Sequence, residues 1–171
     1  ESRDGGISFQ RPVLNLAEFE GSTENNILAI GGAPTIPPPF IDTRPECPPD
    51  RRYKGLSSSW QKVYAMCSAD GLSWRLMSED TLAMDSINTA FWDPRIGKYR
   101  SFTRYMENLK PDSDEADVLG IHATVVRAIQ SSTSDDFIHW SPVKHHVYAD
   151  GEDQWQLYTN ATLPCPGAEH I

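Results

Sequence analysis

The chain has 171 residues, of which 39% are hydrophobic and 23% are charged, a balance typical of a globular domain rather than of a disordered segment. Its 24 acidic and 15 basic residues give a net charge of −9, which disfavours nucleic acid as a partner, and no apolar run is long enough to span a membrane. The 13 Pro and 11 Gly residues argue against a helical bundle and favour short strands joined by turns.

Three related turn motifs recur along the chain. Each has a Ser, then an Asp in a tight turn, then an aromatic residue, which is Phe9, Trp74 or Trp140. The intervals between these aromatic residues, 74 − 9 and 140 − 74, are 65 and 66 residues, which indicates a repeat. The Asp caps N–H groups of its own turn, and the aromatic side chain packs between neighbouring sheets. We expect hairpin turns flanked by strands at residues 4–6, 70–71 and 135–136.

Between these turns, the sequence predicts two sets of paired strands and the start of a third. The predicted strands, in chain order, are residues 39–43, 52–59, 62–67, 90–94, 98–105, 124–129 and 157–161. Four strands in each repeat is the make-up of a propeller blade. We therefore predict an all-β fold, a β-propeller fragment of about 2.6 four-stranded blades (171 residues divided by 66). Its predicted parts are a blade remnant at 1–25, blades at 26–80 and 85–145, and a remnant at 155–171.

Asp42 and Asp93 hold equivalent places in consecutive repeats, each two residues after a Phe. The innermost strands of a propeller line its central channel, so residues placed alike in successive blades converge on the axis. Two carboxylates held apart are what the cleavage of a glycosidic bond requires. An Asp at the end of a strand also commonly caps the turn that follows it. The spacing leaves both interpretations of the two residues open.

The cysteines and histidines do not indicate a metal site. The three cysteines, Cys47, Cys67 and Cys165, lack the spacing of zinc ligands and are too few for a disulfide framework. We therefore expect ordinary thiols, no metal and no cofactor.

The stretch from Asn88 to Tyr105, Asn-Thr-Ala-Phe-Trp-Asp-Pro-(x)3-Lys-Tyr-x-x-Phe-x-Arg-Tyr, resembles the second-blade segment of the five-bladed glycoside hydrolases of families 32 and 43. A longer pattern over essentially the whole chain is similar to proteins like the family 32 amino-terminal domain, and the first turn motif resembles the Asp-box of sialidases. Trp92 stands where family 32 has an Arg, and the nucleophile and acid motifs of that family are absent.

The resemblance implies a five-bladed propeller that acts on carbohydrate. It implies that Asp93 stabilises a transition state, with Asp42 as a candidate base or nucleophile. The candidate substrate-binding residues are Asp85, Asn88, Trp92, Arg104 and Asn160. Trp92 stacks on a sugar ring or packs between blades, and Arg104 contacts a substrate or pairs with an Asp. The resemblance also favours a secreted or periplasmic location.

The alternative function is a non-catalytic propeller that binds carbohydrate or protein. Carboxylates roughly 5–10 Å apart in the channel favour a hydrolase, whereas a channel lined by aromatic or amide groups favours a binding protein. Two chains of about 2.6 units supply about 5.2 units, close to one five-bladed ring. We therefore expect a homodimer in which each chain covers the open blade faces of the other.

Overall fold

The computed structural model describes residues 1–29, 36–59, 62–80, 88–108, 125–148, 157–165 and 167–168. The chain divides into two compact units, Glu1–Ile36 and Pro37–Ile171, each of which is treated by itself below. Within the described ranges, no helix is long and apolar enough to cross a membrane.

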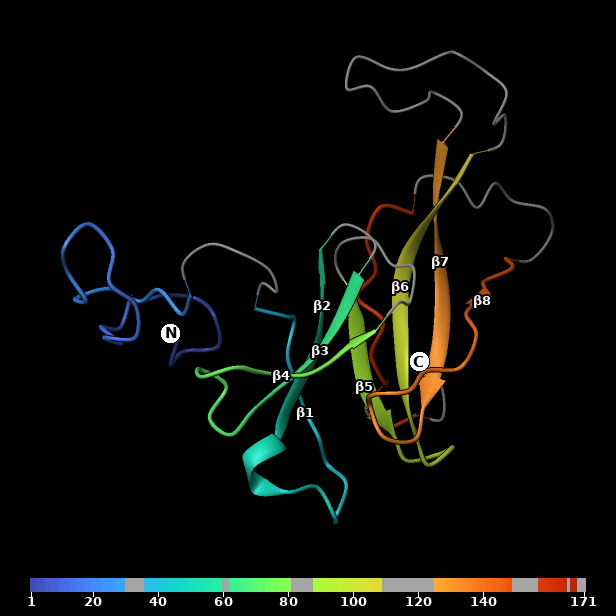
Figure 1. The fold of residues 1–171 in the computed structure, drawn as a ribbon, viewed down its shortest axis with the longest axis horizontal. Helices are drawn as coiled ribbons and strands as arrows, with labels where there is room; N and C mark the ends of the chain where they lie inside the picture. Colours follow the sequence, from blue (N-terminus) through green and yellow to red (C-terminus); the bar gives the residue numbers. More distant parts are fainter. Residues whose placement is uncertain are drawn as a thin grey trace. The chain divides into compact units, whose positions relative to one another are not determined.

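The unit Pro37–Ile171 contains two antiparallel sheets of four strands, and in each sheet the strands are neighbours in chain order (Figure 1). The first sheet comprises β1 (Phe40–Ile41), β2 (Tyr53–Ser59), β3 (Lys62–Ser68) and β4 (Arg75–Asp80). The second sheet comprises β5 (Thr89–Asp93), β6 (Lys98–Asn108), β7 (Val125–Ser134) and β8 (Lys144–His145). A short 3-10 turn, Pro49–Arg51, precedes β2. The chain is therefore essentially all-β, as the sequence predicts.

The two sheets are built with the same register. Phe40 in β1 lies opposite Lys54 in β2, and Phe91 in β5 lies opposite Arg100 in β6. Each pair places a cationic side chain of the second strand across from the Phe that comes two residues before an Asp. The repeat seen in the sequence is thus a repeat of cross-strand pairs.

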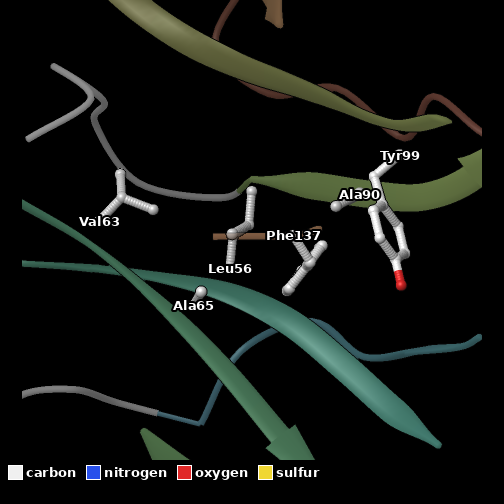
Figure 2. Packing of buried hydrophobic residues seen from close by; sticks show 6 residues of the cluster. All are labelled: Leu56, Val63, Ala65, Ala90, Tyr99 and Phe137. Carbon is white, nitrogen blue, oxygen red and sulfur yellow. The ribbon is translucent and has the colours of Figure 1, made fainter. Parts of the chain in front are cut away.

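The buried core lies between the two sheets (Figure 2). The buried side chains are Leu56, Val63 and Ala65 from the first sheet, and Ala90, Tyr99 and Phe137 from β5, β6 and the turn after β7. Tyr99 and Phe137 are completely buried, and their ring centroids lie 5.0 Å apart. Aromatic burial of this kind supplies much of the hydrophobic free energy of a small β-domain.

The turn between β3 and β4 is closed by hydrogen bonds from its own Ser and Asp. The Ser68 hydroxyl donates to Asp70 Oδ1 at 2.9 Å and accepts the N–H of Gly71 at 2.9 Å. Asp70 Oδ1 also accepts the N–H groups of Leu72 and Ser73, both at 2.8 Å. Gly71 has φ +78°, a conformation that glycine adopts without steric cost. This confirms the predicted turn at 70–71.

The same hydrogen bonds recur after β7, where Ser134 and Asp136 form the turn. The Ser134 hydroxyl donates to Asp136 Oδ1 at 3.1 Å and accepts the N–H of Phe137 at 2.9 Å. Asp136 Oδ1 accepts the N–H groups of Ile138 and His139 at 2.8 and 2.7 Å. Phe137 therefore occupies the place of Gly71, with φ +68°. The aromatic residue of this motif, Trp140, packs against Phe137 with ring centroids 5.5 Å apart, as predicted.

The first turn forms its local hydrogen bonds but not its predicted strands. Asp4 Oδ1 accepts the N–H groups of Ile7 and Ser8 at 3.1 and 3.0 Å. No strand flanks this turn in the described part of Glu1–Ile36, which has a single isolated bridge, Phe19 to Ser22. Because the described part of Glu1–Ile36 contains no sheet, the packing of Phe9 between sheets stays a prediction. The turn bonds span a few residues, whereas a strand needs a partner strand.

We expect the Asp70 carboxyl to titrate far below an ordinary Asp. The N–H groups of Ser73 and Leu72 and the Ser68 hydroxyl bind the ionised form, which lowers the pKa of Asp70 to about 2. Because the folded pKa lies below the unfolded value of about 3.9, the turn adds stability above pH ~4 and loses it as the pH falls toward 2. NMR titration of the carboxyl carbon measures the pKa directly. Asp70→Asn should flatten the decline in stability between pH 4 and 2, and a midpoint of Asp70 near 3.9 would contradict this account.

Candidate functional site

Asp42 follows β1 directly, and its side chain is fully buried. Its carboxylate accepts the backbone N–H of Arg44 at 3.1 Å, lies 3.3 Å from Arg44 Nε, and receives hydrogen bonds from Lys54 Nζ and the Tyr99 hydroxyl. Lys54 Nζ also lies 3.2 Å from the sulfur of Cys47. Burial raises the pKa of Asp42, but the bonds from Lys54 and Tyr99 outweigh it, so the pKa lies below its usual range. Asp42 is therefore ionised, and three side chains bind its carboxylate.

Asp93 ends β5 and is bound in a similar way. Arg95 contacts both carboxylate oxygens, Nε to Oδ1 at 2.7 Å and Nη2 to Oδ2 at 3.0 Å, and its backbone N–H donates at 3.1 Å. Arg100 Nε forms an ion pair with Oδ2 at 2.9 Å. The Asp93 side chain is 1% exposed, and the bond from Arg95 is the main reason that the pKa of Asp93 lies below its usual range.

The two aspartates belong to one repeated arrangement that our sequence analysis missed. In each repeat an Arg stands two residues after the Asp, as Arg44 and as Arg95. The second cation comes from the neighbouring strand, where Lys54 and Arg100 hold equivalent register positions. The signal was present as Asp-x-Arg in both repeats. The arrangement caps the turn after the first strand and ties that strand to the second.

Trp92 packs against Tyr99 and Arg44, two of the residues that bind Asp42. Its ring is half-buried, and its centroid is 5.1 Å from that of Tyr99 in an edge-on arrangement. The guanidinium of Arg44 lies 5.1 Å from the Trp92 ring centroid and 4.6 Å from that of Tyr99. Of the two roles considered for Trp92, this geometry matches packing between the sheets.

A second group of predicted residues gathers around Tyr158. Arg104 Nη1 donates to the carbonyl of Tyr158 at 2.9 Å, and the guanidinium carbon lies 4.4 Å from the Tyr158 ring centroid. The hydroxyl of Thr89 donates to Asn160 Oδ1 at 2.8 Å. Tyr158 itself is 58% exposed. We call Thr89, Arg104, Tyr158 and Asn160 the Tyr158 site.

Asn88, a predicted substrate-binding residue, stands directly before β5. Asn88 is 1% exposed. In the part of the chain that the structure describes, neither the oxygen nor the nitrogen of its amide has a hydrogen-bond partner. A buried amide without partners costs free energy, so such groups are rare and call for an explanation. Asp85, the remaining candidate for substrate binding, lies outside the described residues.

The Tyr158 site and the ion pairs of Asp93 with Arg95 and Arg100 lie at opposite ends of β5. Thr89, which bonds Asn160, is the first residue of the strand and Asp93 is its last. Four residue steps along an extended strand span about 13 Å, at roughly 3.3 Å per residue. The structure therefore joins Arg104 and Asn160 to one segment, through Tyr158 and Thr89, and it places Asp93 at the far end of the strand. No cluster of three or more His, Cys, Asp or Glu side chains suited to a metal ion occurs in the described ranges.

Comparison of the chain with protein-family models, with curated proteins and with solved structures gives no match. The resemblance to the propeller hydrolases of families 32 and 43 therefore stays a prediction from sequence.

Proposed function

We propose that this chain is part of a carbohydrate-binding β-propeller and that it binds its ligand at the Tyr158 site, without hydrolysis at Asp42 and Asp93. The observation that carries the proposal is the separation of the two groups. The amide, hydroxyl and aromatic side chains gather at one end of β5, and the Asp93 carboxylate is enclosed in ion pairs at the other end.

The propeller part of the proposal follows from the two sheets. Each sheet has four antiparallel strands that are neighbours in chain order, and the second sheet repeats the register of the first. A buried aromatic layer joins them through Tyr99 and Phe137. These are the features of successive blades in a propeller.

Asp42 and Asp93 are poorly suited to cleave a glycosidic bond. A nucleophile or base must reach the sugar, yet both side chains are buried and both carboxylates are engaged by two cationic residues. A general acid needs a raised pKa, whereas the pKa values of both residues are lowered. The geometry supports a structural role for both.

The Tyr158 site has the groups that bind a sugar. A pyranose presents hydroxyls that donate and accept hydrogen bonds, and an apolar face that packs on an aromatic ring. Tyr158 offers an exposed ring, and the hydroxyl of Thr89 and the amide of Asn160 lie beside the segment that carries it. A few convergent polar groups around an aromatic side chain are typical of small-molecule sites.

We expect the purified protein to bind oligosaccharides on a glycan array and in titration calorimetry, with no release of reducing sugar. Tyr158→Ala should weaken binding up to about tenfold, because contact with an aromatic ring contributes roughly 0.5–1.5 kcal/mol beyond the area that it buries. Tyr148→Ala is the matched control, since Tyr148 is an exposed Tyr outside the site. Absence of binding to any glycan would contradict the proposal. So would sugar release that Asp93→Asn abolishes without a loss of stability.

A further inference from the structure

Cys47 and Lys54 form a contact that the proposed function does not use. The sulfur of Cys47 lies 3.2 Å from Lys54 Nζ, and the two residues belong to the loop after β1 and to β2. Lys54 is 1% exposed, whereas Cys47 is half-buried, so a small molecule can reach its thiol from solvent. An accessible thiol is thus held against the nitrogen of a buried lysine.

Hydrogen bonds hold both members of this pair in place. The loop between β1 and β2 is closed by the N–H of Asp42, which donates to the carbonyl of Arg52 at 2.8 Å. Within the loop, the N–H of Cys47 donates to the carbonyl of Arg44 at 3.1 Å. Lys54 Nζ donates to the carboxylate of Asp42. The contact between sulfur and nitrogen is therefore built into the fold of the loop.

The second repeat lacks this contact, and the difference is chemical. Residues 94–97, between β5 and β6, contain no Cys, and Arg100 takes the register position of Lys54. A guanidinium group stays protonated in proteins, whereas a lysine amine becomes a nucleophile when it loses a proton. Of these two equivalent positions, only the one beside a thiol has an amine.

We propose that hydrogen peroxide joins Cys47 to Lys54 through a reversible covalent S–N bond, a sulfenamide. In the first step the sulfur of Cys47 attacks one oxygen of the peroxide. The O–O bond breaks, an S–O bond forms, and the other oxygen leaves as water with the thiol proton. The sulfur loses two electrons, the peroxide gains them, and the product is a sulfenic acid.

In the second step the amine of Lys54 attacks the sulfur of the sulfenic acid, which condenses with a nearby thiol or nitrogen. The carboxylate of Asp42, which accepts a hydrogen bond from Nζ, takes one proton of the ammonium group and frees the lone pair of the nitrogen. The S–N bond forms and the S–O bond breaks. The hydroxyl leaves as water with a second proton from Nζ, so this step consumes no oxidant.

Cys67 is the competing partner, because it lies opposite Lys54 in the pairing of β2 with β3. Its thiol is completely buried, and burial raises the pKa of Cys67, which disfavours the thiolate that attacks a sulfenic acid. Lys54 Nζ, in contrast, already lies in contact with the sulfur of Cys47. The geometry therefore favours a bond from cysteine to lysine over a disulfide.

Mass spectrometry of the whole chain after treatment with hydrogen peroxide tests the inference. We expect the loss of two hydrogens, and a tryptic digest in which the peptides of Cys47 and Lys54 are joined and cleavage after Lys54 is lost. Dithiothreitol should reverse both changes, because two thiols reduce the S–N bond to thiol and amine. Cys47→Ser should abolish the cross-link, whereas Cys67→Ser and Cys165→Ser, which remove the other two thiols, should keep it.

Three results would overturn the inference: a disulfide of Cys47, oxidation of Cys47 without a bond to Lys54, and no reaction at Cys47. Protein unfolded in urea is the control for geometry, and it should give no joined peptides because the pair is no longer held together. Equal cross-linking in urea would also overturn the inference. The digest of the unaltered protein decides it even if the variants fold poorly, and none of these readouts depends on carbohydrate binding.

Discussion

Replacement of Phe137 with Ala is expected to lower the free energy of unfolding by about 3–5 kcal/mol, the range measured for large aromatic residues in cores. Phe137 is completely buried, and its ring contacts those of Phe40, Tyr99 and Trp140 at centroid distances of 5.6, 5.0 and 5.5 Å. It therefore joins the turn after β7 to both sheets. Urea denaturation followed by tryptophan fluorescence measures the change. Leu72→Ala, in the equivalent turn of the first sheet, should change stability by less than about 1 kcal/mol because Leu72 is 39% exposed.

A second substitution of Phe137 distinguishes the loss of packing from the steric cost of its positive φ. A residue other than Gly at φ +68° carries a steric cost of roughly 1–2 kcal/mol, which Ala at this position retains and Gly removes. Phe137→Gly should therefore be less destabilising than Phe137→Ala, although it removes one carbon more. A larger loss in the Gly variant would show that the positive φ is not strained here.

Asp42→Asn is expected to destabilise the fold by about 3–5 kcal/mol, since removal of one partner from a buried ion pair leaves the other charge uncompensated. Lys54, which would face the neutral amide, is 1% exposed, so water cannot solvate its ammonium group in place of the carboxylate. The amide oxygen of Asn can still accept the hydrogen bond of the Tyr99 hydroxyl, so the expected loss comes from the missing charge. The change is measured by urea denaturation at neutral pH.

Two further variants test whether the loss of stability is smaller where the ion pair is more exposed. Asp93→Asn should cost about 1–2 kcal/mol, because the side chains of Arg95 and Arg100 are each 31% exposed and can regain water. Asp135→Asn is the control and should cost less than about 1 kcal/mol, as its partner Lys98 is 41% exposed and Asp135 itself 78%. If Asp42→Asn left stability unchanged, the structural role of this carboxylate would be wrong and a catalytic role would again be open.

The sequence by itself determined what depends on short stretches of chain. The Ser–Asp turns were predictable because Ser68 bonds Asp70, and Asp70 bonds residues two and three positions later. The all-β character followed from the strand patterns between these turns. The separation of Asn88 from Asp93 could also be predicted from the sequence, since two residues five positions apart in an extended strand lie far from each other.

The tertiary structure alone decided the contacts between distant residues. Asp42 meets Tyr99 across 57 positions, Arg104 meets Tyr158 across 54, and Thr89 meets Asn160 across 71. No local preference encodes such pairs, because they depend on how one sheet packs on the next and on which strand lies beside which. The same packing also determined the backbone conformation of Phe137. Phe137 accepts a positive φ because its ring is buried between the sheets.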